Sequence, residues 1–239
     1  MLPYLLLDAG GTVLFPNHGA IRDAVRRHGH DVADDVMKHA MTDFIRHLDE
    51  MLRLGGPPVD VPAFVRWVLD RAGVDPTVIP AIQTELREMD RVTSLWSFTY
   101  PWVRAALDAL SAMGCSMSII SNADGRVREE LEQVDLLGYF EQVFDSALVG
   151  CAKPDERFFD HALSALALKP EQCVYVGDVF YIDVLGANRA GIAAIHLDPG
   201  GLYADWPGYR LPSIAELPGA LESGLDLSSD VFFSLRGFV

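Results

Sequence analysis

The sequence has little cysteine, little lysine and no long uninterrupted apolar segment. None of its apolar runs reaches the roughly 18–20 residues that a membrane-spanning helix needs, so we expect no membrane span. Met1 leads directly into a short apolar strand pattern, which does not resemble a secretory signal peptide. The three cysteines, Cys115, Cys151 and Cys173, are odd in number and lack Cys-x-x-Cys spacing. They favour a cytoplasmic protein without a disulfide framework.

Positive charge is also scarce. The 239 residues carry a formal net charge of −15, and Lys38, Lys153 and Lys169 are the only lysines. An acidic chain of this kind repels nucleic acids and anionic membrane surfaces over long range, so neither is an expected partner. A small anionic substrate would need a metal ion or a few fixed cations at its binding site. The sequence leaves open whether the protein is a monomer or a homodimer.

The first apolar run, residues 4–7, ends abruptly at Asp8, after which the chain reads Ala-Gly-Gly-Thr. A strand does not continue through such a segment, because glycine weakens strands and permits tight turns. We therefore expect Asp8 at the carboxyl end of a strand, the edge where open α/β sheets bind ligands. The alternative is that Asp8 merely starts a turn, and this stretch alone does not decide between the two.

A helical region follows the first strand. Apolar residues recur there at three- and four-residue steps over residues 36–52, 61–69 and 79–89. This spacing is typical of amphipathic helices, and no strand pattern interrupts it. We predict a core domain formed by residues 1–16 and 93–239, with residues 17–92 inserted as an all-helical domain.

Beyond residue 115 the pattern alternates between strand and helix. Strands are expected at residues 117–120, 173–176 and 192–197, with a weaker strand region at 143–149. Alternation of this kind predicts an α/β fold, in which helices cover both faces of a parallel sheet. The last residues, 231–239, are unusually apolar for a terminus, and we expect them to pack on the core or on a second copy.

Several of these strands end in polar residues. Ser121 and Asn122 follow one, Asp178 follows another, and Lys153 precedes a proline that suits a helix start. Each of them could be a helix cap or a turn residue. The carboxyl ends of parallel strands share one edge, however, so these residues and Asp8 are expected to converge.

In these motifs the sequence resembles the haloacid dehalogenase superfamily of hydrolases. Residues 8–12 are similar to the family's first motif, Asp-x-Asp-Gly-Thr, and Ser121 to its second. Lys153 with the following proline is similar to the third, and residues 177–183 to the fourth, Gly-Asp-x4-Asp. The helical insertion resembles the family's C1 cap. The resemblance covers nearly the whole chain and implies a Rossmann-like parallel-sheet core with an inserted all-helical cap.

The resemblance implies a Mg²⁺-dependent phosphohydrolase. A carboxylate at Asp8 can attack a phosphoryl group and form an aspartyl-phosphate. Because two anions repel each other, a Mg²⁺ ion must bridge them, and it favours a few carboxylates plus water. We expect metal ligands from the carboxylates of Asp8 and Asp178 and from the backbone carbonyl of Gly10. Asp183 is expected to support the metal site without contacting the ion.

The remaining polar residues of the motifs are expected to bind the phosphoryl group of the substrate. They are Thr12, Ser121, Asn122 and Lys153. The lysine would also orient the nucleophile and offset charge in the transition state. The alternative role for Asp178 and Asp183 is helix N-terminal capping. The implied cap would close over the sheet edge, exclude water and set substrate choice.

One position departs from the family pattern. In the family's phosphatases the second aspartate of the first motif protonates the leaving alcohol and then activates water, but here that position is Gly10. A general acid–base contributes about 10²–10⁴-fold, so ordinary phosphomonoester hydrolysis should be slow unless another group replaces it. Candidates are the substrate, water or a cap residue such as His18. An acyl phosphate, whose leaving group needs little protonation, would make the aspartate dispensable.

Other interpretations of this glycine stay open. Phosphonoacetaldehyde hydrolase also has a small residue there and uses a cap lysine to form a Schiff base, and Lys38 is the only lysine in the predicted cap. The 2-haloacid dehalogenases lack the aspartate too, but they use no metal and lack the fourth motif found at 177–183. The last interpretation is a catalytically weakened protein that binds a phosphorylated ligand or partner. The retained Asp8 and Lys153 speak against it, because binding alone requires no nucleophile.

Overall fold

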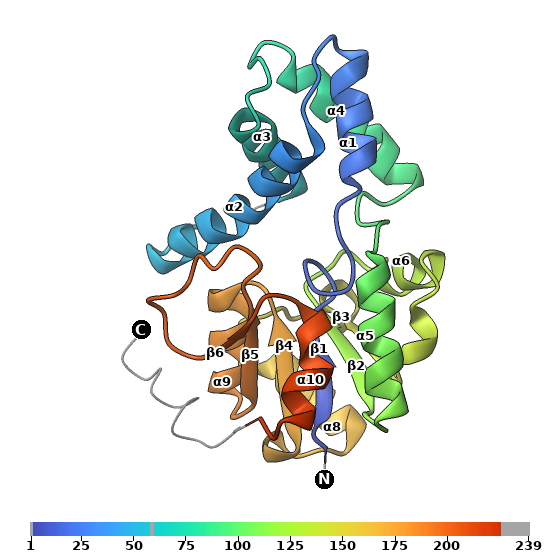
Figure 1. Ribbon diagram of the computed structural model, residues 1–239, viewed down its shortest axis with the longest axis vertical. Coiled ribbons are helices and arrows are strands. Elements are labelled where there is room, and N and C mark those ends of the chain that lie inside the picture. The colour runs from blue at the N-terminus through green and yellow to red at the C-terminus, as the bar shows by residue number, and fades with distance from the viewer. Residues whose placement is uncertain (1, 58–59, 226–239) are drawn as a thin grey trace. The chain divides into compact units, whose positions relative to one another are not determined.

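The computed structural model describes residues 2–57 and 60–225 and divides into two compact units (Figure 1). The core unit comprises residues 1–15 and 99–239, and the helical unit comprises residues 16–98. The apolar terminal segment singled out above, 231–239, lies outside the described residues. Within the described part of the chain, no helix has both the length and the apolar character needed to cross a membrane.

The core unit contains one sheet of six strands. They are β1 (Tyr4–Leu7), β2 (Met117–Ser121), β3 (Val143–Asp145), β4 (Cys173–Gly177), β5 (Ala193–Leu197) and β6 (Tyr209–Leu211). Their order across the sheet is β3-β2-β1-β4-β5-β6, and every neighbouring pair is parallel. The predicted α/β fold with a parallel sheet and a helical insertion is therefore confirmed.

The strand order creates a switch point next to β1. From β1 the chain builds outward to β2 and β3 on one side, then returns to place β4, β5 and β6 on the other. In open α/β sheets the connections on the two sides of such a point diverge, and ligands bind at the carboxyl edge there. β1 and β4 lie on either side of the switch point, with Leu7 in register with Val176. The residues that follow these two strands are Asp8 and Asp178.

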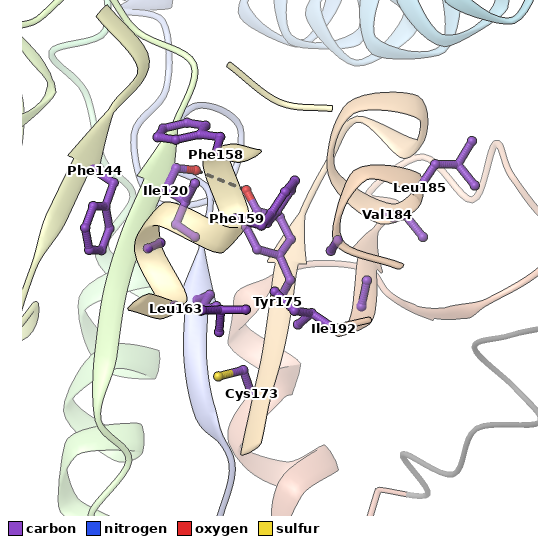
Figure 2. Packing of buried hydrophobic residues seen from close by; sticks show 14 of the residues in the cluster. Ile120, Phe144, Phe158, Phe159, Leu163, Cys173, Tyr175, Val184, Leu185 and Ile192 are labelled. Carbon is purple, nitrogen blue, oxygen red and sulfur yellow. Dashed lines mark hydrogen bonds between the residues drawn. The ribbon is translucent and has the colours of Figure 1, made fainter. Parts of the chain in front are cut away.

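Helices cover both faces of the sheet. They are α5 (Pro101–Ala112), α6 (Val127–Gln133), α7 (Ser146–Val149), α8 (Glu156–Leu166), α9 (Leu185–Arg189) and α10 (Leu217–Glu222), with short helical turns at η1 (Leu137–Tyr139), η2 (Pro170–Gln172), η3 (Phe180–Val184) and η4 (Ile214–Glu216). α8 and α9 pack on one face through a buried cluster that includes Phe158, Phe159 and Tyr175 (Figure 2). α5 and α10 contact each other on the opposite face (Figure 1). Burial on both faces explains why the central strands are almost wholly apolar.

Two local expectations differ from the structure. The strand expected over 143–149 stops at Asp145, because the Asp145 carboxylate accepts a hydrogen bond from Ala147 N (2.9 Å) and caps the short helix α7. Gly150, with φ +85°, ends that helix in the left-handed conformation that glycine adopts readily. Strand β6 was not expected, since its three residues, Tyr-Arg-Leu, contain no apolar run.

The helical unit consists of four helices. They are α1 (His18–Arg27), α2 (Asp34–Arg53), α3 (Val61–Arg71) and α4 (Ile79–Val92). Each helix contacts the next, and α1 also contacts α4. Met37, Phe44, Phe64, Val68 and Ile82 lie in their shared interior. The described residues of this unit contain no strand, as the apolar spacing predicts.

Candidate functional site

Asp8 lies directly after β1, at the switch point of the sheet. Its backbone N–H donates to the carbonyl of Val176 (2.8 Å), so the strand pairing with β4 continues one residue past Leu7. The chain then turns, and Ala9 N donates back to Asp8 Oδ1 (2.7 Å). The carboxylate is thereby held at the carboxyl edge, largely buried.

Two further carboxylates meet Asp8 there. Oxygen atoms of Asp8, Asp178 and Asp183 all lie within 4.8 Å of one another. Asp178 follows the last residue of β4, and Asp183 belongs to the helical turn η3. The side chain of Asp183 is fully buried, and its Oδ2 accepts a hydrogen bond from Val179 N (3.0 Å). The expected convergence of these motifs on one edge is therefore seen in the structure.

Lys153 joins two of the carboxylates. Its Nζ lies 2.8 Å from Asp8 Oδ1 and 2.8 Å from Asp183 Oδ1, and its side chain is 1% exposed. The amide of Asn122 holds the lysine backbone from both sides: Nδ2 donates to Lys153 O and Oδ1 accepts from Lys153 N, each at 2.8 Å. The loop after β2 thus fixes the position from which the lysine reaches the site.

The site carries more negative than positive charge. Among the described residues, only Lys153 forms an ion pair with any of the three carboxylates. Burial raises the pKa of Asp8 to about 6, although Lys153 opposes this shift. Burial, followed by the charges of Asp8 and Asp183, raises the pKa of Asp178 well above its usual value. A divalent cation would offset this excess, and an all-oxygen set of carboxylates fits Mg²⁺.

Two glycines allow the carboxylates to approach the backbone. A Cβ on Gly11 would lie 1.9 Å from Asp178 Oδ2, and one on Gly177 would lie 2.5 Å from Asp183 Cγ. Gly11 also has φ +73°, a conformation that side-chain-bearing residues rarely adopt. Both glycines are thus required by the space that the acidic groups occupy. Both positions are glycine in the motif patterns, and the close approach of the carboxylates explains why.

Gly11→Ala is expected to destabilise the protein by more than about 1 kcal/mol and to weaken Mg²⁺ binding at least about tenfold. The added methyl group must displace the Asp178 carboxylate, whereas Gly114→Ala imposes the same kind of backbone strain in open space (φ +85°). Chemical unfolding and a Mg²⁺ titration followed by thermal unfolding measure both quantities. Equal Mg²⁺ affinity in the two variants would contradict the assignment of Asp178 to the metal.

A protein-family model matches most of the chain. Residues 4–191 match the family model described as haloacid dehalogenase-like hydrolase. The chain belongs to this family. The match begins at β1 and ends after α9, so it includes the helical unit, the core unit as far as α9 and every residue of the acidic cluster.

Individual relatives of this haloacid dehalogenase-like hydrolase have low sequence identity to it. A glyceraldehyde 3-phosphate phosphatase from Pyrococcus furiosus is 28% identical over 229 residues, 91% of this chain and 88% of that protein. Alignments with other curated relatives cover only 41% to 51% of their length, so the chain spans about half of those proteins.

Solved structures of low identity share the fold. A hydrolase of this type from Bacillus subtilis, bound to magnesium, is 18% identical with a TM-score of 0.63, covering 93% of this chain and 100% of that chain. An L-2-haloacid dehalogenase from Xanthobacter autotrophicus with chloropropionic acid covalently bound is 15% identical with a TM-score of 0.59, covering 94% and 100%. The fold is thus common to magnesium-binding and dehalogenating members.

The end of β2 and the turn after β1 contain three other residues that were expected at the site of this hydrolase. Ser121 is the last residue of β2 and is buried. Thr12 is fully buried, and its Oγ1 has no hydrogen-bond partner among the described residues. Gly10 bridges to Leu14 within the turn after β1. The phosphoryl contacts of Thr12, Ser121 and Asn122 and the metal contact of the Gly10 carbonyl stay predictions.

The two cap candidates belong to the helical unit. His18 Nε2 lies 3.9 Å from Asp34 Oδ1, and burial lowers the pKa of the imidazole. Lys38 Nζ lies 2.7 Å from Asp34 Oδ2. Schiff-base formation requires a neutral lysine amine with room to reach a carbonyl carbon, whereas the Lys38 side chain forms an ion pair in this structure. Their catalytic roles stay predictions.

Two site residues escaped the sequence analysis. Tyr175 reads as part of an apolar strand, yet its hydroxyl accepts a hydrogen bond from Lys153 Nζ (2.7 Å). His196 lies in register with Gly177, and its Nε2 is 3.0 Å from the carbonyl oxygen of Asp178. Burial lowers the pKa of His196, which favours a neutral ring that donates from Nε2. The available signal was the period-2 pattern, which places Tyr175 on the same face of β4 as Gly177.

Proposed function

We propose that the protein is a Mg²⁺-dependent phosphohydrolase that acts on a small phosphorylated metabolite through an aspartyl-phosphate on Asp8. The observation that carries the proposal is the buried cluster in which Asp8 shares one lysine with Asp183 and lies beside Asp178. The phosphatase names of its relatives, for glyceraldehyde 3-phosphate and phosphoserine, support the same class of substrate.

In the proposed reaction a carboxylate oxygen of Asp8 attacks phosphorus, and the bond from phosphorus to the leaving oxygen breaks. The leaving group departs with the bonding electrons; an alkoxide then takes a proton from water, whereas a carboxylate needs none. Water then attacks phosphorus of the aspartyl-phosphate, releasing phosphate and restoring the Asp8 carboxylate. Bonds from Ala9 N and Lys153 Nζ to Oδ1 fix the orientation of the nucleophile throughout.

Lys153 and a metal ion, when bound, would offset the negative charge of the phosphoryl group. The lysine ammonium offsets negative charge near the attacked phosphorus, since it lies within hydrogen-bond distance of the nucleophile. The carboxylates of Asp8 and Asp178, with the Gly10 carbonyl, would hold Mg²⁺, which supplies further charge stabilisation for the phosphoryl group. Asp183, paired with Lys153 and bonded to Val179 N, holds the lysine and the loop in place.

Gly10 favours a particular kind of leaving group. With no acid at this position, an alcohol must leave with little protonation, whereas the carboxylate released from an acyl phosphate leaves readily. We therefore expect kcat/KM for acetyl phosphate to exceed that for simple alkyl phosphates by at least about 10²-fold, the range that a missing general acid costs.

The test is turnover of a panel of alkyl, sugar and acyl phosphates with and without Mg²⁺. Mg²⁺-dependent turnover with acyl phosphates ahead supports the proposal. Metal-independent release of halide from 2-chloropropionate would instead favour dehalogenation. No turnover, together with Mg²⁺-dependent phosphate binding that survives Asp8→Asn, would favour the weakened ligand-binding protein.

A further inference from the structure

Tyr175 lies in the middle of β4, an inner strand of the sheet whose other residues before the final glycine are Cys173, Val174 and Val176. Its side chain is fully buried, and its ring packs edge-to-face against Phe159, with centroids 5.3 Å apart at 77°. Figure 2 shows the ring among Ile120, Phe159 and Leu163, with its hydroxyl directed to the carbonyl of Ile120. Packing of this kind leaves the hydroxyl little freedom to move.

The hydroxyl lies at a junction of polar contacts. It accepts a hydrogen bond from Lys153 Nζ (2.7 Å) and lies 3.1 Å from both Ile120 O and Asp183 Oδ1. Its single proton can donate to one of these two oxygens at a time. Burial and the nearby carboxylates raise the pKa of Tyr175 well above its usual value, so the phenol keeps this proton.

Tyr175 therefore completes the surroundings of the lysine. An ammonium has three donors, and Lys153 has three acceptors: Asp8 Oδ1, Asp183 Oδ1 and the Tyr175 hydroxyl. Without the hydroxyl, one donor of a buried ammonium would lack a partner. The long lysine side chain would then be held by the two carboxylates alone, and its position between them would be less defined.

We propose that Tyr175 is a positioning residue that fixes the Lys153 ammonium at the distance and orientation at which it serves Asp8. This inference rests on the proposed function, since it assigns Lys153 a role in phosphoryl transfer. Small displacements of a charged group from the reacting atoms lower the rate strongly. The hydroxyl should matter more for the chemical step than for substrate binding, because it acts through the lysine.

The test is Tyr175→Phe, which removes one oxygen from a packed ring. With acetyl phosphate and Mg²⁺ we expect kcat to fall at least about tenfold, while KM changes less than about threefold. Tyr4→Phe is the matched control, because the Tyr4 hydroxyl is also bonded within the sheet, to Ser118 Oγ (2.7 Å), but forms no hydrogen bond with Lys153. A purely structural loss would affect both variants alike.

A second readout needs no turnover. The chain has three lysines, so protein labelled with ¹⁵N at lysine Nζ contains only three ammonium groups, of which Lys153 is the buried one. Tyr175→Phe should shift the Lys153 signal and speed its hydrogen exchange, and Tyr4→Phe should leave it unchanged. An unaltered Lys153 signal in Tyr175→Phe would overturn the inference. If the wild type turns over no phosphate, the proposed function fails, and this comparison still decides the role of Tyr175.

Discussion

Asp8→Asn is expected to lower turnover of acetyl phosphate by at least about 10³-fold, because the variant replaces the attacking carboxylate with an amide. The two side chains have nearly the same size, so the packing at the end of β1 should persist. The main-chain bond from Asp8 N to Val176 O does not involve the side chain and should also remain. Steady-state kinetics with Mg²⁺ in excess measures the loss, and circular dichroism checks the fold.

Asp205→Asn is the control for this substitution. Asp205 is an exposed carboxyl of the same unit, in the segment between β5 and β6. The same chemical change there should leave kcat/KM within about twofold of the wild type. Turnover by Asp8→Asn within tenfold of the wild type would show that another group performs the attack.

Lys153→Met is expected to destabilise the protein by about 3–5 kcal/mol, the usual cost of removing one partner of a buried ion pair. The ammonium is 1% exposed and bonded to Asp8 and Asp183, so its loss leaves both carboxylates buried without a cation. Urea unfolding of the metal-free protein measures the change in the free energy of unfolding. Turnover should be lost as well.

The destabilisation caused by Lys153→Met should grow as pH rises. Burial already raises the pKa of Asp8 above its unfolded value, and removing Lys153, which opposes the shift, raises it further. At pH values between the pKa of Asp8 in the unfolded state and its pKa in the folded state, the unfolded state binds fewer protons than the folded state. The free energy of unfolding therefore falls as pH increases. The deficit of Lys153→Met should therefore be larger at pH 8 than at pH 5, and Mg²⁺ should partly offset it. Lys169→Met, at an exposed position, should change stability by less than about 0.5 kcal/mol at either pH.

The acidic site could be predicted because its signals are local. Asp8 follows an apolar run and is followed by Ala-Gly-Gly, and Asp178 follows an apolar run that ends in Gly177; each change of pattern marks a strand end. The parallel arrangement of the strands then brings the two positions together without any long-range information. Gly11 and Gly177 belong to the same two stretches, and at each of them a Cβ would occupy the space that a carboxylate fills.

Other parts depend on contacts that no local pattern contains. Tyr175 reads as a strand residue: alternation places it on the same face of β4 as Gly177, but only the folded chain shows that its hydroxyl meets Lys153. Strand β6 is too short to show alternation and forms by pairing with β5. Helix α7 replaces a predicted strand because one carboxylate, that of Asp145, caps its first turn.

The proposed reaction requires that Asp8 become covalently phosphorylated. The most direct measurement is to mix the wild-type protein with acetyl phosphate and Mg²⁺, quench in acid, and reduce with borohydride, which converts an aspartyl-phosphate to homoserine. Peptide mass spectrometry then identifies the modified residue. We expect homoserine at position 8 in the wild type and none in Asp8→Asn. Rapid turnover of acetyl phosphate with position 8 unmodified, or with the modification on another residue, would contradict it.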